Sequence, residues 1–189
     1  MKLNNKYYIL RHGEALSNAR EIVSSWPEKF NNHLTKKGKL MVKEAAFTLK
    51  NKNIDLIFVS PLLRTRQTAE IVGNILKIKP KIDKRLREIG FGVFNSKPIF
   101  DFHGQFKKEE ERINHSVPKG ETYADLLKRV SSFLKDVDKK YKNKNILIIS
   151  HECPLFLLEG KVKGFSLLET IHNNPFKKRI HKSEVRKLN

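Results

Sequence analysis

Two short apolar segments of this chain end directly at a histidine. The run Tyr7–Leu10 stops at Arg11 and His12. The run 145–150 (NILIIS) stops at His151. Short apolar runs that end abruptly at polar residues are typical of buried strands. In an open parallel sheet the ligand crevice lies at the carboxyl ends of the strands, so both histidines are expected to face one crevice.

The rest of the chain alternates between apolar runs and segments with helical signals. Further strands are expected at 54–59 (IDLIFV) and at 79–82. Thr35 and Thr122 are predicted N-caps, and Pro61 is predicted at the first position of a helix. Helices are expected to begin at Ser17 and to span residues 36–50, 61–76, 99–112, 123–141 and 154–161. Strands alternating with helices predict an α/β fold, a three-layer α/β/α sandwich with a mostly parallel central sheet.

The length of 189 residues fits one domain, which we place at 1–174. Residues 175–189 are strongly basic and poorly periodic, so they are predicted to form a basic C-terminal surface tail, or the stub of a longer chain. No apolar run approaches the roughly 18 residues of a membrane span, and the first ten residues are too polar for a signal peptide. The single cysteine, Cys153, cannot form an internal disulfide, which fits a reducing compartment. A cytoplasmic protein outside the membrane is therefore expected.

The formal net charge is +19 at pH 7, and lysines spread along the whole chain supply most of it. A basic surface attracts anions such as phosphate esters, nucleic acid and anionic lipid. Arginine, which usually reads base edges and forms forked contacts, is scarce among the positive charges. Nucleic acid therefore stays open as a partner but is not favoured, and a compositional bias toward lysine is the preferred interpretation.

Five short motifs lie at or near the expected strand ends. They are RHGEALSN at 11–18, SPLLRTRQTAE at 60–70, LREIGFG at 86–92, PKGET at 118–122 and IISHE at 148–152. In this order and spacing they resemble the histidine phosphatase superfamily, which includes the cofactor-dependent phosphoglycerate mutases and many small phosphatases. The resemblance spans roughly residues 6–160 and favours the small phosphatase branch.

The resemblance implies roles for seven residues. His12 matches the nucleophile that takes the phosphoryl group, and Glu88 matches the acid that protonates the leaving oxygen. The other matches hold the phosphate: Arg11, Arg64 and His151, with Asn18 and Ser17 at positions that often assist them.

These residue types also suit phosphoryl transfer on chemical grounds. A phosphate monoester carries about two negative charges, which two arginines neutralise and orient through forked donors. Neutral imidazole is a good nucleophile near pH 7 because its unperturbed pKa is about 6.5. A glutamate can protonate the departing alkoxide if its pKa is raised. Nothing in this scheme needs a metal or another cofactor.

The chain departs from the family pattern in two places. Many small phosphatases of the family continue from the LRE segment into a glycine and a Trp-Glu-Gly run, whereas here Gly92 is followed by 93–96 (VFNS). Glu152 stands where relatives often have glycine, and its carboxylate is expected either to tune His151 or to face away. The chain also looks shorter than the mutases, which favours a phosphatase.

The sequence therefore predicts a metal-independent phosphomonoesterase that forms a covalent phosphohistidine on His12. Its substrate is expected to be a phosphorylated small molecule or phosphoprotein. Two alternatives stay open: a cofactor-dependent phosphoglycerate mutase, and a phosphatase-like domain of a larger RNA- or tRNA-handling protein. His103 and His115 lie in the segment expected to cover the pocket, Trp26 is interpreted as packing, and the charge run 107–112 as a solvated face.

Overall fold

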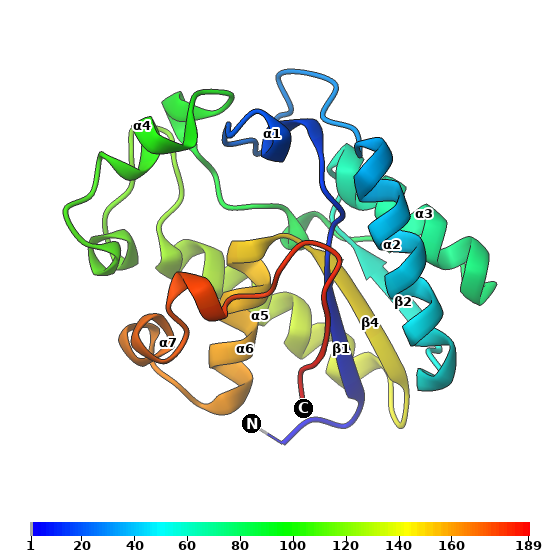
Figure 1. Ribbon diagram of the computed structural model, residues 1–189. Coiled ribbons are helices and arrows are strands. Elements are labelled where there is room, and N and C mark those ends of the chain that lie inside the picture. The colour runs from blue at the N-terminus through cyan, green and yellow to red at the C-terminus, as the bar shows by residue number, and fades with distance from the viewer. Residues whose placement is uncertain (1) are drawn as a thin grey trace.

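Five strands form one sheet at the centre of the computed structural model, which describes residues 2–189 (Figure 1). Side by side, they are β3 (Lys81–Ile82), β2 (Leu56–Val59), β4 (Asn145–Ser150), β1 (Lys6–Arg11) and β5 (Val185–Lys187). The first four are parallel, and β5 runs antiparallel to β1. The prediction of a mostly parallel central sheet is confirmed.

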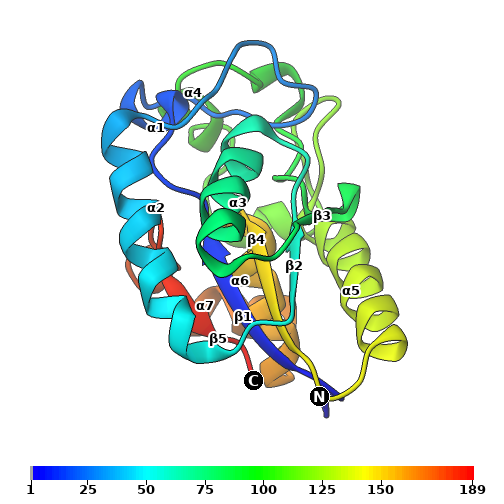
Figure 2. The ribbon, with the colours of Figure 1, turned by 90° about the vertical axis from the view of Figure 1, so that its right-hand side faces the viewer.

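Helices cover both faces of this sheet, as the view in Figure 2 shows. One face carries α2 (Lys36–Leu49) and α3 (Leu63–Leu76). The other carries α5 (Tyr123–Lys140) and α6 (Glu152–Lys163). The shorter helices are α1 (Leu16–Ala19), α4 (Ile99–His103) and α7 (Leu167–Asn173). The predicted three-layer α/β/α sandwich is confirmed.

The central strand β4 is apolar on both sides because each side is covered by helices. Ile146 and Ile148 join the buried cluster under α5 and α6, whereas Leu147 and Ile149 join the cluster under α2 and α3. The alternation follows from the period of two in a strand. Burial of each such side chain stabilises the fold by about 1.5–3 kcal/mol. The packing therefore fixes where the strand lies and where it ends.

Two predicted N-caps are confirmed, and one predicted helix start is wrong. Thr35 and Thr122 accept backbone N–H groups in the first turns of α2 and α5. The next helix, α3, begins at Leu63 rather than at Pro61. A carboxylate from a distant loop explains this start, because Glu28 Oε2 accepts the Leu63 N–H at 2.8 Å.

The helix predicted over 99–112 is interrupted. α4 ends at His103, and a separate 3-10 turn covers Glu109–Ile113. The interruption turns Arg112 inward, where its side chain is only 4% exposed and stacks over the Tyr123 ring. The charge run 107–112 is therefore not a solvated face throughout.

The prediction that residues 175–189 form a surface tail is wrong. Strand β5 pairs with Tyr8–Leu10 of β1, and the Leu188 N–H donates to the Tyr7 carbonyl. Arg179 and Ile180, which precede β5, are buried. The open edge of β1 offers backbone hydrogen-bonding groups that need partners, and the end of the chain supplies them. These residues are thus part of the domain.

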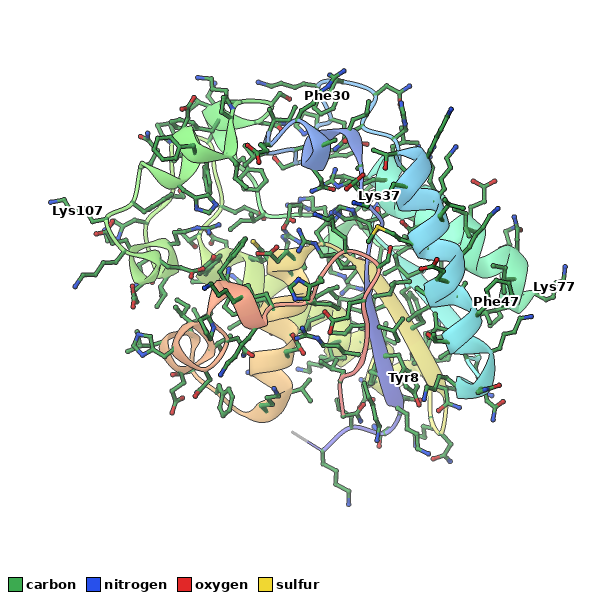
Figure 3. The ribbon with its side chains drawn as sticks, viewed as in Figure 1. Tyr8, Phe30, Lys37, Phe47, Lys77 and Lys107 are labelled. Carbon is green, nitrogen blue, oxygen red and sulfur yellow. The ribbon has the colours of Figure 1, made fainter. Side chains whose placement is uncertain are left out.

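Charged side chains cover the outer surfaces of the helices. Lys37 on α2 and Lys77 at the end of α3 are exposed, as is the Phe47 ring on α2 (Figure 3). Among residues 2–189 no helix is both long and apolar enough to cross a membrane.

The ends of the central strands meet at one edge of the sheet. Arg11 of β1 is the register partner of Ser150 of β4, so His12 and His151 leave neighbouring strands at the same level. The helix α6 begins at Glu152, directly after His151 and two residues before its predicted start. The first residue after β2, Ser60, lies at the same edge.

Candidate active site

A cavity of about 860 Å³ opens at the carboxyl ends of these strands. Six of the seven residues predicted to form the site line it: Arg11, His12, Ser17, Asn18, Arg64 and Glu88. The seventh, His151, is fully buried, and its ring centroid lies 5.1 Å from that of His12. We call Arg11, His12, Arg64 and His151 the cavity floor.

Two hydrogen bonds fix the His12 ring and its tautomer. Its Nδ1 lies 2.7 Å from the Gly13 carbonyl oxygen, so Nδ1 carries the proton and donates. Its Nε2 then has a lone pair, which accepts the Arg64 Nε–H at 3.1 Å. Burial, followed by the charges of Arg64 and Arg11, lowers the pKa of His12 well below 6.5. The imidazole is therefore neutral near pH 7, with Nε2 as its basic nitrogen.

His151 has the same tautomer, with its proton on Nδ1. Its Nε2 lies 2.8 Å from Ser60 Oγ. Since Ser60 Oγ accepts the Leu62 N–H at 3.4 Å, its own hydroxyl proton is free to donate to that Nε2. The remaining nitrogen, Nδ1, is buried with no partner among residues 2–189. Burial and the Arg64 charge lower the pKa of His151, so Nδ1 is a neutral N–H donor in the floor.

Loop residues hold the Arg64 side chain across the cavity. Its Nη2 donates to the Ser24 carbonyl oxygen at 2.9 Å, and Glu28 lies 3.7 Å from Nη1. Burial lowers the pKa of Arg64 to about 10, which still leaves the guanidinium charged at pH 7.

The other arginine of the floor, Arg11, is held by the last residues of the chain. Its Nη1 donates to the Ile180 carbonyl oxygen at 3.0 Å and pairs with Glu152 at 2.5 Å. The Ser183 N–H donates to the Arg11 carbonyl oxygen at 3.0 Å. Arg11 Nε is buried and has no partner among residues 2–189, so this donor is free for an anion in the cavity.

Glu88 sits in a loop that a half-buried ion pair holds in place. Arg129 donates to the Glu88 carbonyl oxygen at 3.0 Å and pairs with Glu121 at 2.8 Å, and Glu121 also accepts the Gly90 N–H. The Glu88 carboxylate accepts the Ile89 N–H at 2.9 Å. Burial raises the pKa of Glu88 despite this bond and nearby Arg64. The environment thus favours a protonated carboxyl group, which is the form that donates a proton.

Ser17 and Asn18 meet the cavity beside α1. Asn32 holds Ser17 by two hydrogen bonds of 2.9 Å, one to its hydroxyl and one from its N–H. Asn18 Oδ1 accepts the Ala15 N–H, which turns the amide group of Asn18 away from the backbone as a free donor.

Sequence reasoning missed the residues that position the floor. Ser24 positions Arg64 through its carbonyl oxygen, Ser60 positions His151 through its hydroxyl oxygen, and the Glu28 carboxylate lies beside Arg64. No sequence pattern marked any of the three residues as part of the site. The signal for Glu121 was present in the PKGET motif, but its link to Glu88 runs through Arg129, 8 residues further along the chain. Only the folded chain brings these groups together.

Aromatic rings and basic side chains form the outer wall of the cavity. We define the outer wall as the lining residues of segments 91–112 and 176–182, among them Phe91, Phe102, Phe106, Arg112, Arg179 and Lys182. His103 lies in this wall, whereas His115 and Trp26 do not line the cavity. Two further glutamates adjoin the predicted site motifs: Glu152 lines the cavity and Glu14 does not.

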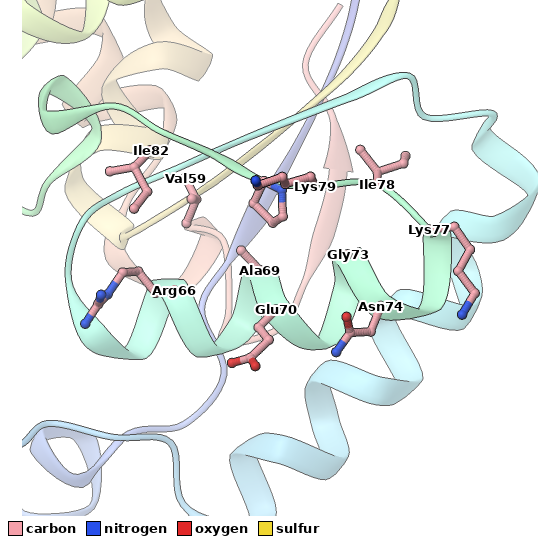
Figure 4. Close-up of a pocket in the computed structure, with 11 residues that line it drawn as sticks. Val59, Arg66, Ala69, Glu70, Gly73, Asn74, Lys77, Ile78, Lys79 and Ile82 are labelled. Atoms are coloured by element: carbon pink, nitrogen blue, oxygen red, sulfur yellow. The ribbon is translucent and has the colours of Figure 1, made fainter.

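A second hollow of about 580 Å³ lies between α3 and the segment that leads into β3 (Figure 4). Arg66, Glu70 and Lys77 extend at its rim, and none of the predicted site residues lines it. Among residues 2–189 no group of three histidine, cysteine or acidic side chains is arranged to hold a metal ion.

Comparison with known proteins matches residues 7–174 to the model of the histidine phosphatase superfamily (branch 1). "Putative phosphoserine phosphatase 2" of Hydrogenobacter thermophilus is 28% identical, over 86% of this chain and 80% of its own. "Probable phosphoglycerate mutase GpmB" of Erwinia tasmaniensis is 26% identical, over 83% of this chain and 74% of its own.

Solved structures share the fold. YhfR of Bacillus stearothermophilus aligns with a TM-score of 0.82 and 23% identity, over 96% of this chain and 89% of its own. The phosphoserine phosphatase of Entamoeba histolytica, solved in complex with 3-phosphoglyceric acid, aligns with a TM-score of 0.77 and 21% identity, over 96% and 88%.

Proposed function

Because this chain belongs to the histidine phosphatase superfamily and is a phosphatase, we propose that it hydrolyses phosphate monoesters through a phosphohistidine on His12. The observation that carries the proposal is the basic Nε2 of His12, in a floor that holds three donors for a phosphate. Arg64 donates to it directly, Arg11 Nε is free, and His151 Nδ1 is free.

The phosphate group of the ester binds on the floor. Arg64 and Arg11 neutralise its charge, and their forked donors orient it for attack in line with the leaving oxygen. On binding, the Arg64 Nε–H turns from His12 to a phosphate oxygen, which frees the lone pair of Nε2. The His151 Nδ1–H donates to another phosphate oxygen and stabilises the charge that builds there in the transition state.

In the first step His12 Nε2 attacks phosphorus, and the bond from phosphorus to the ester oxygen breaks. Glu88 gives its proton to that oxygen, so the alcohol leaves in neutral form. The His12 Nδ1–H donates to the Gly13 carbonyl oxygen throughout, which keeps the ring oriented and stabilises the phosphohistidine.

In the second step the Glu88 carboxylate takes a proton from a water molecule. The resulting hydroxide attacks phosphorus, the bond from phosphorus to nitrogen breaks, and phosphate leaves. His12 and Glu88 return to their starting forms, and no step requires a metal, since the arginines and His151 supply the positive charge and donors.

The proposed substrate is a phosphorylated small molecule, because a cavity of about 860 Å³ falls within the size range of small-ligand sites. The proposed compartment is the cytoplasm, because the single buried cysteine fits a reducing environment. A mutase that passes the phosphoryl group to a sugar acid is the second candidate, favoured by relatives named phosphoglycerate mutase.

Hydrolysis of p-nitrophenyl phosphate in the presence of EDTA tests the proposal. We expect release of p-nitrophenol and phosphate in equal amounts, with a rate unchanged by EDTA. Loss of activity in EDTA that a divalent ion restores would refute the metal-independent mechanism. Adding glycerate and following phosphorus by NMR separates the two candidates, because a mutase would form phosphoglycerate and a phosphatase only inorganic phosphate.

A further inference from the structure

One buried cation in the outer wall has no carboxylate partner. Arg112 is 4% exposed and lines the same cavity as His12 and Glu88. Among residues 2–189 no acidic side chain lies within ion-pair distance of its guanidinium: the Cys153 thiol is a hydrogen-bond partner, and the Glu109 carboxylate acts from further away. Its Nη2 is buried without a hydrogen-bond partner. A buried charge without a close carboxylate is energetically costly, so a fold seldom retains one without a ligand to meet it.

Aromatic rings offset part of this cost. The guanidinium carbon of Arg112 lies 4.3 Å from the ring centre of Tyr123, 5.0 Å from that of Phe102 and 5.8 Å from that of Phe106. Cation–π contacts of this kind stabilise the charge. They do not satisfy the in-plane N–H donors, because a ring face is no substitute for a forked oxygen acceptor.

The other buried arginine of the outer wall does have acidic partners. Arg179 is 3% exposed, and it pairs with Glu109 at 2.5 Å and approaches Glu152 at 3.7 Å. Its neighbour Arg112 lies on the same 3-10 turn as Glu109 yet receives no such partner. Among residues 2–189 the other buried arginine nitrogen without a partner is Arg11 Nε, where the phosphate is proposed to bind.

Glu88, Cys153 and Arg112 line the same cavity. Burial and the Glu88 charge raise the pKa of the Cys153 thiol, and the Arg112 charge opposes that rise. Both charged groups therefore act on this one thiol. If Glu88 protonates the leaving oxygen, the rest of the alcohol extends past Cys153 toward Arg112.

We propose that Arg112 binds a second anionic group, a carboxylate or a second phosphate, carried on the alcohol part of the ester. This inference rests on the proposed function of the floor. It narrows the substrate class to phosphate esters whose alcohol carries an anion a few carbons from the ester oxygen. Phe91, Phe102 and Phe106 would contact the carbon chain between the two anions.

Calorimetric titration with phosphonates tests this proposal, because the carbon–phosphorus bond is not hydrolysed and binding is read without turnover. The ligands are phosphonocarboxylates with spacers of three to six methylenes, alkylphosphonates of equal length, and the matching bisphosphonates. At one spacer length we expect wild type to bind the ligand with a second anionic group about tenfold or more tightly than the alkylphosphonate. Arg112→Met should remove that preference and leave alkylphosphonate affinity nearly unchanged. The carboxylate and bisphosphonate arms distinguish the two kinds of second anion.

Two further variants distinguish a forked hydrogen-bonded contact of Arg112 with the anion from general electrostatic attraction by the basic cavity. Lys108→Met removes a charge from the exposed rim of the same cavity, and it should retain the preference. Arg112→Lys keeps the charge over the rings without the fork, so it should fold even if Arg112→Met does not, and should retain only part of the preference.

Three outcomes would overturn the proposal: no preference at any spacer in wild type, a full preference in both Arg112 variants, or its equal loss in Lys108→Met. Failure of the proposed function gives a different pattern. In that case p-nitrophenyl phosphate is not hydrolysed, whatever the phosphonate titrations give.

Discussion

The cavity floor and the outer wall differ in how their charged side chains are held. On the floor, backbone carbonyls, Ser60 and Arg64 fix both imidazole rings, so that each ring keeps a definite tautomer. In the outer wall, exposed lysines and aromatic rings dominate, and the segments that carry them have little regular structure. The floor is built where two largely buried strands end, whereas the wall is built from loops and short helical turns.

This difference separates two tasks. A reaction centre needs groups held to within a fraction of an ångström, which rigid strands and second hydrogen bonds provide. Recognition of the alcohol needs shape and charge that vary between substrates, and loops on a rigid scaffold provide those. We therefore expect changes to the floor to affect the rate for every ester, and changes to the wall to affect the choice among esters.

The largest effect should come from His12→Ala. Without the nucleophile, kcat/KM should fall by about 10⁴-fold or more for all esters. The fold should persist, since the His12 ring belongs to the cavity floor rather than to the apolar core. Rapid quench of wild type with labelled substrate should trap an acid-labile, base-stable phosphoryl group that is absent from the variant. Circular dichroism serves as the control for folding, and an acid-stable adduct would point to another nucleophile.

A smaller and substrate-dependent effect is expected for Glu88→Gln. General acid help is worth roughly 10²–10⁴-fold where the leaving group is a poor one. An alkyl phosphate should therefore lose that much in kcat/KM, and p-nitrophenyl phosphate, which has a good leaving group, much less.

The pH dependence gives a second measurement on the same variant. Because burial raises the pKa of Glu88, its acid form persists above pH 4.5 and is lost as pH rises through the raised value. The rate of alkyl ester hydrolysis by wild type should therefore decline on the basic side of its pH profile. This decline should be absent from the pH profile of Glu88→Gln. An equal loss on both esters would mean that Glu88 only positions groups, and no loss would move the acid role to Glu152.

The smallest of these effects is expected from deletion of residues 183–189, which tests whether the last residues of the chain support the floor. The deletion removes β5 and the Ser183 N–H that donates to Arg11 and His12. Two lost hydrogen bonds correspond to about 1–3 kcal/mol, or roughly a five- to 150-fold drop in kcat/KM.

The melting temperature should fall as well, because the edge of β1 becomes exposed. Lys187→Ala is the matched control, since it removes an exposed charge and keeps the backbone pairing. Full activity of the truncated chain would restore the sequence-based view that this segment is a dispensable tail.

Much of the floor could be predicted because its residues follow strong local signals. Burial on both faces requires continuous apolar runs, so the ends of β1 and β4 can be read directly, and the histidines stand at those ends. The caps at Thr35 and Thr122 are equally local, since a threonine hydroxyl meets a backbone N–H three residues away. The residue types then fit phosphoryl transfer without reference to the rest of the chain.

Tertiary contacts determine two features that no local sequence pattern predicts, strand β5 and the burial of Arg112. Strand β5 has three residues and no clear alternation, and it forms because the edge of β1 is open to it. Arg112 belongs to a run of charged residues, which predicts solvent exposure. Only the interruption of the helix before it and the aromatic rings around it make it a buried cation without an ion-pair partner. Sequence determined where strands end and which groups stand there, because those depend on neighbours in the chain. Structure determined which distant groups complete the cavity, because burial and pairing depend on neighbours in space.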